Sequence, residues 1–301
     1  MSRKNKVKKV KEQKVKPKML KRRKPNRSKV GDIIIYFMLA LIAVAMAFPL
    51  VFAINSALKP LDELFLFPPK VFAQNPTLDN FQDLIVTMGK SWVPFSRYIF
   101  NTVFITLAGT VGHLIIASMG AYVLAKYDFP GGRGFFRLVQ IALMFNGYAI
   151  AIPNYLVLNH LNLIDSYWAI IIPAFASPMG MFLMKQFMEG LPMSLIEAAK
   201  IDGSHEMGVF IKIVMPNVKP AWLTMIIFSI QNLWNNSAST LIYSEEKKTL
   251  VYALQQISAG GIARTGQAAA VTVIIMSVPL IIFIISESRI LETMASSGIK
   301  E

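Results

Sequence analysis

The sequence contains no cysteine among its 301 residues. Disulfides, thiol catalysis and cysteine-ligated metal sites are therefore excluded together. Charged residues are also scarce, at 16%, whereas hydrophobic residues make up 54% of the chain. This excess of apolar residues over an average soluble domain predicts a membrane protein.

Motifs for nucleotide hydrolysis and for metal binding are missing as well. No G-x-x-x-x-G-K-[ST] phosphate-binding loop occurs, and Gly131–Gly134 is not followed by Lys-Ser or Lys-Thr. There is no histidine-rich metal motif and no G-x-S-x-G motif. We therefore expect no enzyme activity, no cofactor and no metal in this chain. If it moves a solute against a gradient, the energy must come from another subunit.

Positive charge is concentrated at the N-terminus. Residues 1–30 hold 15 of the 31 Lys and Arg residues against one acid, Glu12, so this tail carries the whole formal charge of +14. A segment so basic and so poor in apolar residues is predicted to be disordered. Nucleic-acid binding is one interpretation, but attraction to anionic lipid of the cytoplasmic leaflet is favoured. We expect a cytoplasmic tail without a nucleic-acid partner.

Six apolar segments are each long enough to cross a bilayer, which takes about 20 residues. These segments lie at roughly 33–56, 98–124, 135–159, 166–188, 218–242 and 267–289. Lys and Arg occur in the connections Lys126–Arg133 and Lys185–Lys219 but not around residues 160–165. The positive-inside rule then places both termini in the cytoplasm. We predict an all-α, multi-pass protein of the cell membrane, with a transmembrane domain at 31–301 and an external segment at 57–97.

A polar insert, Pro192–Pro216, separates the fourth and fifth apolar segments. Ser194 and Glu197 have the S-x-x-E spacing of a capping box, which predicts the start of a short helix. Gly203 can adopt the left-handed conformation that ends this helix.

A second short helix is predicted to begin at Ser204, a good N-cap residue, and to end at Pro216. Together the two helices form a pair in a cytoplasmic loop at 189–217. Because they lie outside the bilayer, their apolar faces need another protein to cover them.

Uncharged polar residues gather in the predicted spans. The fifth segment contains Gln231, Asn232, Asn235 and Asn236 around Trp234. Amides beside an aromatic ring suit a sugar, whose hydroxyls need paired donors and acceptors. We therefore predict that these five residues line a solute pathway; hydrogen bonding between helices is the alternative.

His113 lies in the middle of the second predicted span, and Gln140, Asn146, Tyr148 and Asn154 lie in the third. A single histidine inside a membrane helix is more often a hydrogen-bonded packing residue than a proton carrier. Charged residues are nearly absent from the spans, which argues against an ion-coupled carrier.

The polar insert also carries a longer pattern. Glu197-Ala198-Ala199 is followed at fixed spacing by Gly203, Ile213 and Met215-Pro216, and this pattern resembles the EAA loop of binding-protein-dependent ABC importer permeases. Local matches are similar to the carbohydrate branch of that family, and to the second permease subunit of maltose-type systems. These matches are Pro76–Phe81, Ala121–Lys126, Asp128–Gly131 and Gly298–Lys300. The resemblance covers about residues 30–301.

This resemblance implies that the chain forms a translocation pathway with a second permease subunit. It also implies two ATP-binding subunits, which would hold ATP and Mg, and an extracytoplasmic solute-binding protein that supplies most of the specificity for a sugar. The residues implied to dock the ATPase are Glu197, Ala198, Ala199, Asp202, Gly203, Met215 and Pro216, with a further contact at Gly298 and Lys300.

Other functions stay open at this point. One is an ABC importer permease for a non-sugar solute such as glycerol phosphate or a polyol. Another is an ATP-independent secondary carrier, which would need charges or an inverted repeat in the spans. A third is a membrane scaffold. The family's W-N-[DE]-F pattern reads Trp234-Asn235-Asn236-Ser237 here, so a direct contact of this subunit with the sugar does not follow from the resemblance.

Overall fold

The computed structural model describes residues 29–145, 147–261 and 264–297. Every regular element in these ranges is a helix, as predicted. The chain divides into two units, Met1–Pro49 and Leu50–Glu301. The basic tail at 1–28 and the C-terminal contact expected at Gly298 and Lys300 lie outside the described residues.

Helix α1 (Lys29–Leu58) begins in the first unit and confirms the first predicted segment as a helix. Residues 30–58 form a candidate membrane span with a mean hydropathy of 2.7 in its most apolar window. Side chains such as Phe37 and Met46 are exposed. An apolar helix without a polar face is what a lipid environment favours.

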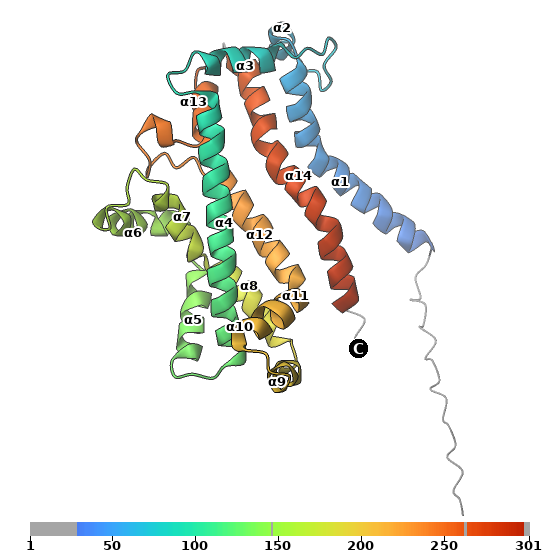
Figure 1. Ribbon diagram of the computed structural model, residues 1–301. Helices are drawn as coiled ribbons and strands as arrows, with labels where there is room; N and C mark the ends of the chain where they lie inside the picture. The colour runs from blue at the N-terminus through green and yellow to red at the C-terminus, as the bar shows by residue number, and fades with distance from the viewer. Residues whose placement is uncertain (1–28, 146, 262–263, 298–301) are drawn as a thin grey trace, which may run out of the picture. The chain divides into compact units, whose positions relative to one another are not determined.

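The second unit is organised around α4 (Phe95–Lys126), whose most extensive packing is against three other helices (Figure 1). These partners are α7 (Trp168–Phe175), α8 (Pro178–Glu189) and α12 (Lys219–Trp234). Helix α14 (Thr265–Ser297) packs against α12, α13 (Leu250–Ser258) and α3 (Asp79–Gly89). The remaining elements are α2 (Leu61–Leu64), α5 (Gly132–Ala142), α6 (Gly147–His160), α9 (Met193–Ile201), α10 (Glu206–Val209), the π-helix η1 (Phe210–Val214), α11 (Met215–Asn217) and the 3₁₀ helix η2 (Glu245–Lys247).

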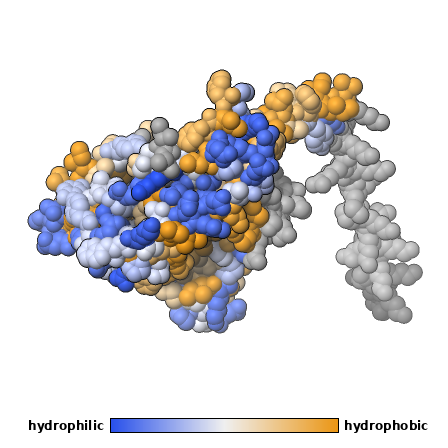
Figure 2. Space-filling model, turned by 90° about the horizontal axis from the view of Figure 1, so that it is seen from above, coloured by the Kyte–Doolittle hydropathy of each residue, from blue (hydrophilic) through white to orange (hydrophobic). Residues whose placement is uncertain are grey.

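The two ends of the second unit differ. Helices α3 and α13 lie at one end, and α9 and α10 lie at the other (Figure 1). Figure 2 looks onto the end with α3, where hydrophilic residues gather on the surface. Helix α3 starts at Asp79, inside the predicted external segment.

Four helical spans in the described residues are long and apolar enough to cross a membrane, and up to six if each bent helix pair counts as one. The third and fifth predicted segments are not single straight helices along their whole length. In the third, α5 and α6 meet at 115°, because the chain turns at Met144 and Phe145 ahead of the poor helix former Gly147.

The fifth predicted segment, 218–242, is helical only as far as Trp234. The amides that follow end the helix by bonding to the local main chain. Asn236 Oδ1 accepts a hydrogen bond from the Ala238 N–H at 2.8 Å, and Ala238 has a φ of +54°. At the N-terminal end of α12, the preceding helical stretch Glu206–Asn217 meets α12 at 83°.

The polar insert forms the predicted pair of short helices, but its caps differ from the prediction. Helix α9 starts at Met193 with Pro192 as its N-cap, and no side chain caps it. The capping box of Ser194 and Glu197 is therefore wrong, because Pro192 with ψ at 135° starts the helix earlier and puts Ser194 inside it.

Gly203 ends α9 as predicted, with a φ of +85°. The Ser204 N–H donates to Ala199 O and the Gly203 N–H to Lys200 O, each at 3.0 Å, which is the Schellman pattern of hydrogen bonds. The next helix is capped by His205 rather than Ser204. Pro216 does not end it, because the π-helix η1 carries the chain on into α11.

Glycine allows α4 to approach its neighbours closely. An added Cβ on Gly112 would lie 2.0 Å from the Phe175 ring on α7, and one on Gly109 would lie 2.6 Å from Leu233 on α12. Small residues let helices pack tightly in lipid, where packing rather than water drives association. These glycines hold the centre of the second unit together.

Gly112→Ala is expected to destabilise the protein by about 1–3 kcal/mol, since the new methyl group forces the Phe175 ring to move. The measurement is thermal unfolding of the purified chain in detergent. Gly134→Ala on α5 is the matched control, because a Cβ there meets nothing within 4 Å and raises helix propensity. Equal melting temperatures for the two variants would contradict the close packing of α4 on α7.

Candidate functional site

The first candidate site is the outer face of α9. Glu197 and Ala198 are exposed on it, and so are Asp202 and Gly203 at its end. Ala199 instead turns inward and is 8% exposed. Pro216 is exposed on α11 and Met215 is half-buried beside it. The residues expected to dock a partner are therefore mostly accessible, with Ala199 as an internal packing residue.

Sequence reasoning missed one residue of this face. Ile201 is 86% exposed at the end of α9, four residues after Glu197 and hence on the same side of the helix. Leu195 and Met193 are each 40% exposed nearby. The helical spacing from Glu197 to Ile201 was a signal that could have found it. An exposed apolar residue next to acidic ones is typical of a protein contact surface.

The inner face of the same loop is firmly packed. Ile196 and Val209 are fully buried in a cluster with Met184 and Met188 of α8 and with Ala121 of α4. Burial of this kind stabilises by about 1.5–3 kcal/mol for each large side chain. The loop therefore has a rigid connection to the helical bundle.

Polar contacts add to this connection. Glu206 accepts hydrogen bonds from the hydroxyls of Tyr122 and Tyr127, and its carboxylate pairs with Lys200. Lys126 donates to Leu191 O at 2.6 Å. These bonds join both halves of the loop to the same end of α4.

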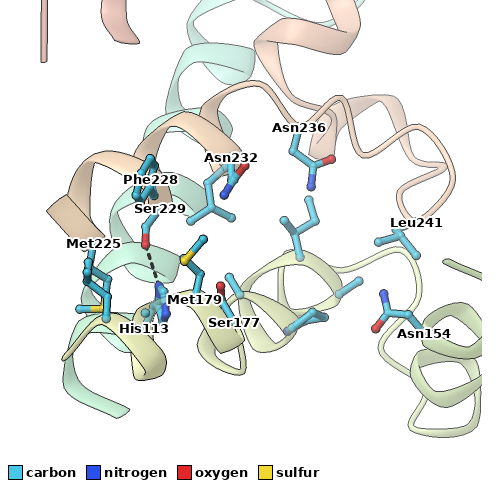
Figure 3. A pocket seen from close by; sticks show the side chains of 17 residues that line it. His113, Asn154, Ser177, Met179, Met225, Phe228, Ser229, Asn232, Asn236 and Leu241 are labelled. Carbon is cyan, nitrogen blue, oxygen red and sulfur yellow. Dashed lines mark hydrogen bonds between the residues drawn. The ribbon is translucent and has the colours of Figure 1, made fainter. Parts of the chain in front are cut away.

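The second candidate site is a cavity of about 420 Å³ between α4, α6, α7, α8 and α12 (Figure 3). Most of its lining is apolar, and the polar side chains are spread along it. In Figure 3, His113 and Ser229 lie at one end, Asn154 lies at the other, and Asn232 and Asn236 point in between them. The lining residues with polar side chains are His113, Asn154, Ser177, Ser229, Asn232 and Asn236.

The five residues predicted to line the pathway do not all face the same cavity. Asn232 and Asn236 line this cavity, whereas Gln231 and Asn235 line a different hollow with α14 residues such as Thr272. Trp234 lines neither of them. It is 8% exposed, and its Nε1–H donates to Ile275 O of α14 at 3.1 Å, so it fixes α12 to α14.

Ser229 and Ser177 were missed by sequence reasoning, and His113 had been interpreted as a packing residue. The His113 Nδ1 does form a 2.7 Å hydrogen bond with Ser229 Oγ, which agrees with that interpretation. Ser229, Asn232 and Asn236 follow a helical spacing of three and four residues, and this stripe was visible in the sequence.

Asp165 ties together the loops beside the cavity. Its carboxylate accepts hydrogen bonds from the main-chain N–H groups of Tyr243 and Ser244 and a 3.3 Å bond from Lys247. Partial burial would raise the pKa of Asp165, but the hydrogen bonds from Ser244, Tyr243 and Lys247 outweigh it and lower the pKa to about 2. Leu241, whose carbonyl accepts from the Asp165 N–H, lines the cavity.

The apolar helical spans of the described residues define an integral membrane protein. A family model described as "Binding-protein-dependent transport system inner membrane component" matches residues 113–293. The chain belongs to this family of ABC transporter permeases.

Two curated relatives and one solved structure are similar to the chain. An arabinooligosaccharide transport system permease protein of Halalkalibacterium halodurans is 36% identical over 65% of this chain and 70% of its own length. An sn-glycerol-3-phosphate transport system permease protein of Pectobacterium atrosepticum is 27% identical over 85% of this chain and 93% of its own.

The solved structure is a bacterial ABC transporter involved in the import of the acidic polysaccharide alginate. It is 24% identical, covers 88% of this chain and 99% of that one, and has a TM-score of 0.73. At this identity, the likeness concerns the fold.

Asp165→Asn is expected to loosen the loop around residues 241–247, because the amide accepts fewer of these hydrogen bonds and cannot pair with Lys247. Trypsin cleavage after Lys247 should become at least about threefold faster at neutral pH, as expected for loss of a charge-assisted bond. Asp202→Asn, an exposed acid at the other end of the unit, is the control and should leave that cleavage unchanged.

The same site predicts a pH dependence. Folding lowers the pKa of Asp165, so its stabilisation is fully present above about pH 4 and is lost as the pH falls toward 2. Unfolding temperatures measured across this range should fall more steeply for the wild type than for Asp165→Asn. Parallel curves would show that the carboxylate does not stabilise the loop.

Proposed function

We propose that this chain is a transmembrane permease subunit of an ATP-driven ABC importer for a sugar or oligosaccharide. The observation that carries the proposal is the α9 loop, whose inner face is fixed to the bundle while its outer face is exposed. A helix held in this way can transmit a displacement, and its outer face needs a partner. The family and the arabinooligosaccharide relative support the sugar as cargo.

The partner at α9 is an ATPase subunit. Glu197, Ala198, Asp202 and Gly203 form the docking surface with Ile201, and Met215 and Pro216 flank it. Closure of two ATPase subunits around ATP and Mg would push α9, and the bundle would switch between inward-open and outward-open packings. ATP hydrolysis then takes place in these separate subunits, while this chain has no catalytic role.

The other subunits of the proposed assembly are inferred from the family to which the chain belongs. A second permease subunit completes the pathway, and an extracytoplasmic solute-binding protein delivers the sugar, as the family description implies. Six spans, with both termini and the α9 loop in the cytoplasm, fit the distribution of Lys and Arg. The basic N-terminal tail contacts anionic lipid, and the C-terminal Gly298 and Lys300 add a second contact with the ATPases.

A glycerol phosphate importer is the second candidate, because one relative over nearly the full chain carries that name. Uptake of labelled sugars and of sn-glycerol 3-phosphate by the complete complex in proteoliposomes separates the two. An ATP-independent carrier would show uptake of either solute without ATP.

Ile201→Ser and Glu197→Ala are each expected to lower ATP-driven sugar uptake by at least about tenfold, the loss of one good contact at an interface. Both side chains are exposed, so insertion and thermal stability should match the wild type. The measurements are uptake and ATP hydrolysis in proteoliposomes that contain all subunits.

The matched control for these variants is Ile211→Ser. Ile211 is also exposed, at 56%, but it lies on η1 rather than on the α9 face. Full uptake by the Ile201 and Glu197 variants, or equal losses in the Ile211 variant, would refute docking at α9.

A further inference from the structure

The cavity beside His113 is built for a ligand without charge. None of the residues that line it is Asp, Glu, Lys or Arg. Its polar groups are amides, hydroxyls and one imidazole, and the aromatic ring of Phe228 also lines it. A buried carboxylate or phosphate would find no opposite charge here, and burial of an unpaired ion is costly.

Several polar atoms in or beside this cavity lack a partner. His113 is 4% exposed, and its Nε2 has no partner at ordinary hydrogen-bond geometry among the described residues. The ring faces Gly180, where a Cβ would lie 2.2 Å from Nε2. On the same helix but outside the cavity lining, the hydroxyls of Thr110, one turn away, and of Thr106, two turns away, are also buried without partners among the described residues.

Asn232 is the accessible polar group of this set. Its amide points into the cavity in Figure 3. The side chain is exposed and makes no hydrogen bond to other described residues, whereas Asn236 already accepts one from Ala238. Because the Asn232 amide has no side-chain hydrogen bond to give up, a ligand in the cavity can bond to it directly, and a typical hydrogen bond contributes about 0.5–1.5 kcal/mol.

We propose that this cavity is a binding subsite for an uncharged glycosyl unit of the imported saccharide. The proposal rests on the proposed function as a sugar permease. The Asn232 amide binds hydroxyls of the sugar, and the Phe228 ring packs on an apolar face of the pyranose or furanose. The volume of about 420 Å³ falls in the range of about 300–1,000 Å³ that is usual for small-ligand sites.

Binding at this site would make the subunit select between saccharides by their charge. A neutral pentose or hexose unit fits both the hydroxyl-binding groups and the absence of charge, whereas a uronate or a phosphate ester does not. A lipid acyl chain would suit the apolar walls but would leave the Asn232 amide unpaired. The subunit therefore prefers neutral saccharides to acidic ones.

The test uses the complex of this chain with the second permease and the ATPases in lipid nanodiscs, without the binding protein. The probes are arabinotriose, galactotriose, maltotriose, trigalacturonate and sn-glycerol 3-phosphate, with binding measured by saturation-transfer NMR titration. Asn232→Ala should weaken binding of at least one neutral trisaccharide by about tenfold, as expected for one lost hydrogen bond. Asn235→Ala is the matched control, since Asn235 directly follows the same helix but lines the other hollow.

Each outcome decides the proposal. Equal affinities for the Asn232 and Asn235 variants, or an effect of Asn232→Ala on trigalacturonate or glycerol phosphate binding, overturn the neutral subsite. The absence of Asn232-dependent binding for all three neutral trisaccharides overturns it too. ATP-driven uptake in proteoliposomes is measured separately. If the wild type takes up a sugar and Asn232→Ala takes it up equally well, the subsite is refuted but the importer function stands. If the wild type takes up no sugar, the importer function itself is refuted.

Discussion

The buried contact between the α9 loop and the bundle is the constraint on which the rest of the structure depends. Ile196, Val209 and Val214 are fully buried against the methionines of α8 and the small residues of α4. Without these side chains, two short helices outside the bilayer would have no fixed position, because helices of this length are marginal alone. With them, the exposed row from Glu197 to Ile201 is held in one orientation, which a docking surface requires.

A second constraint comes from the apolar surroundings of α4. Lipid offers no hydrogen bonds, so polar groups inside a membrane protein turn toward protein or a cavity. Thr106, Thr110 and His113 follow this rule and lie buried on one side of α4. Their neighbours leave three of their polar atoms unpaired. Such groups cost stability, and an apolar residue of the same size would avoid that cost, which supports a role in binding.

The sequence predicted the fold where the signal was long and uniform, as in α1, α4 and α14, and it located the loop that contains α9. It failed where a few residues decide. Gly147 is a poor helix former, and the amides of Asn235 and Asn236 bond to the nearby main chain and compete with the helix. The polar cluster of the fifth segment shows a different limit. Successive residues of a helix lie about 100° apart, so Gln231 and Asn232, adjacent in the sequence, face separate hollows.

The two candidate sites share two side chains, Leu183 of α8 and Met225 of α12. Met225 of α12 is 2% exposed in the cluster that holds the α9 loop, and it also lines the cavity beside His113. Because protein interiors are close-packed, a displacement at Ile196 or Val214 must be taken up by such shared neighbours. Trp234 meanwhile anchors the other end of α12 to α14 through Ile275. A displacement of α9 would therefore reach the α12 residues near Met225 and the wall of the cavity, so the packing connects the two candidate sites.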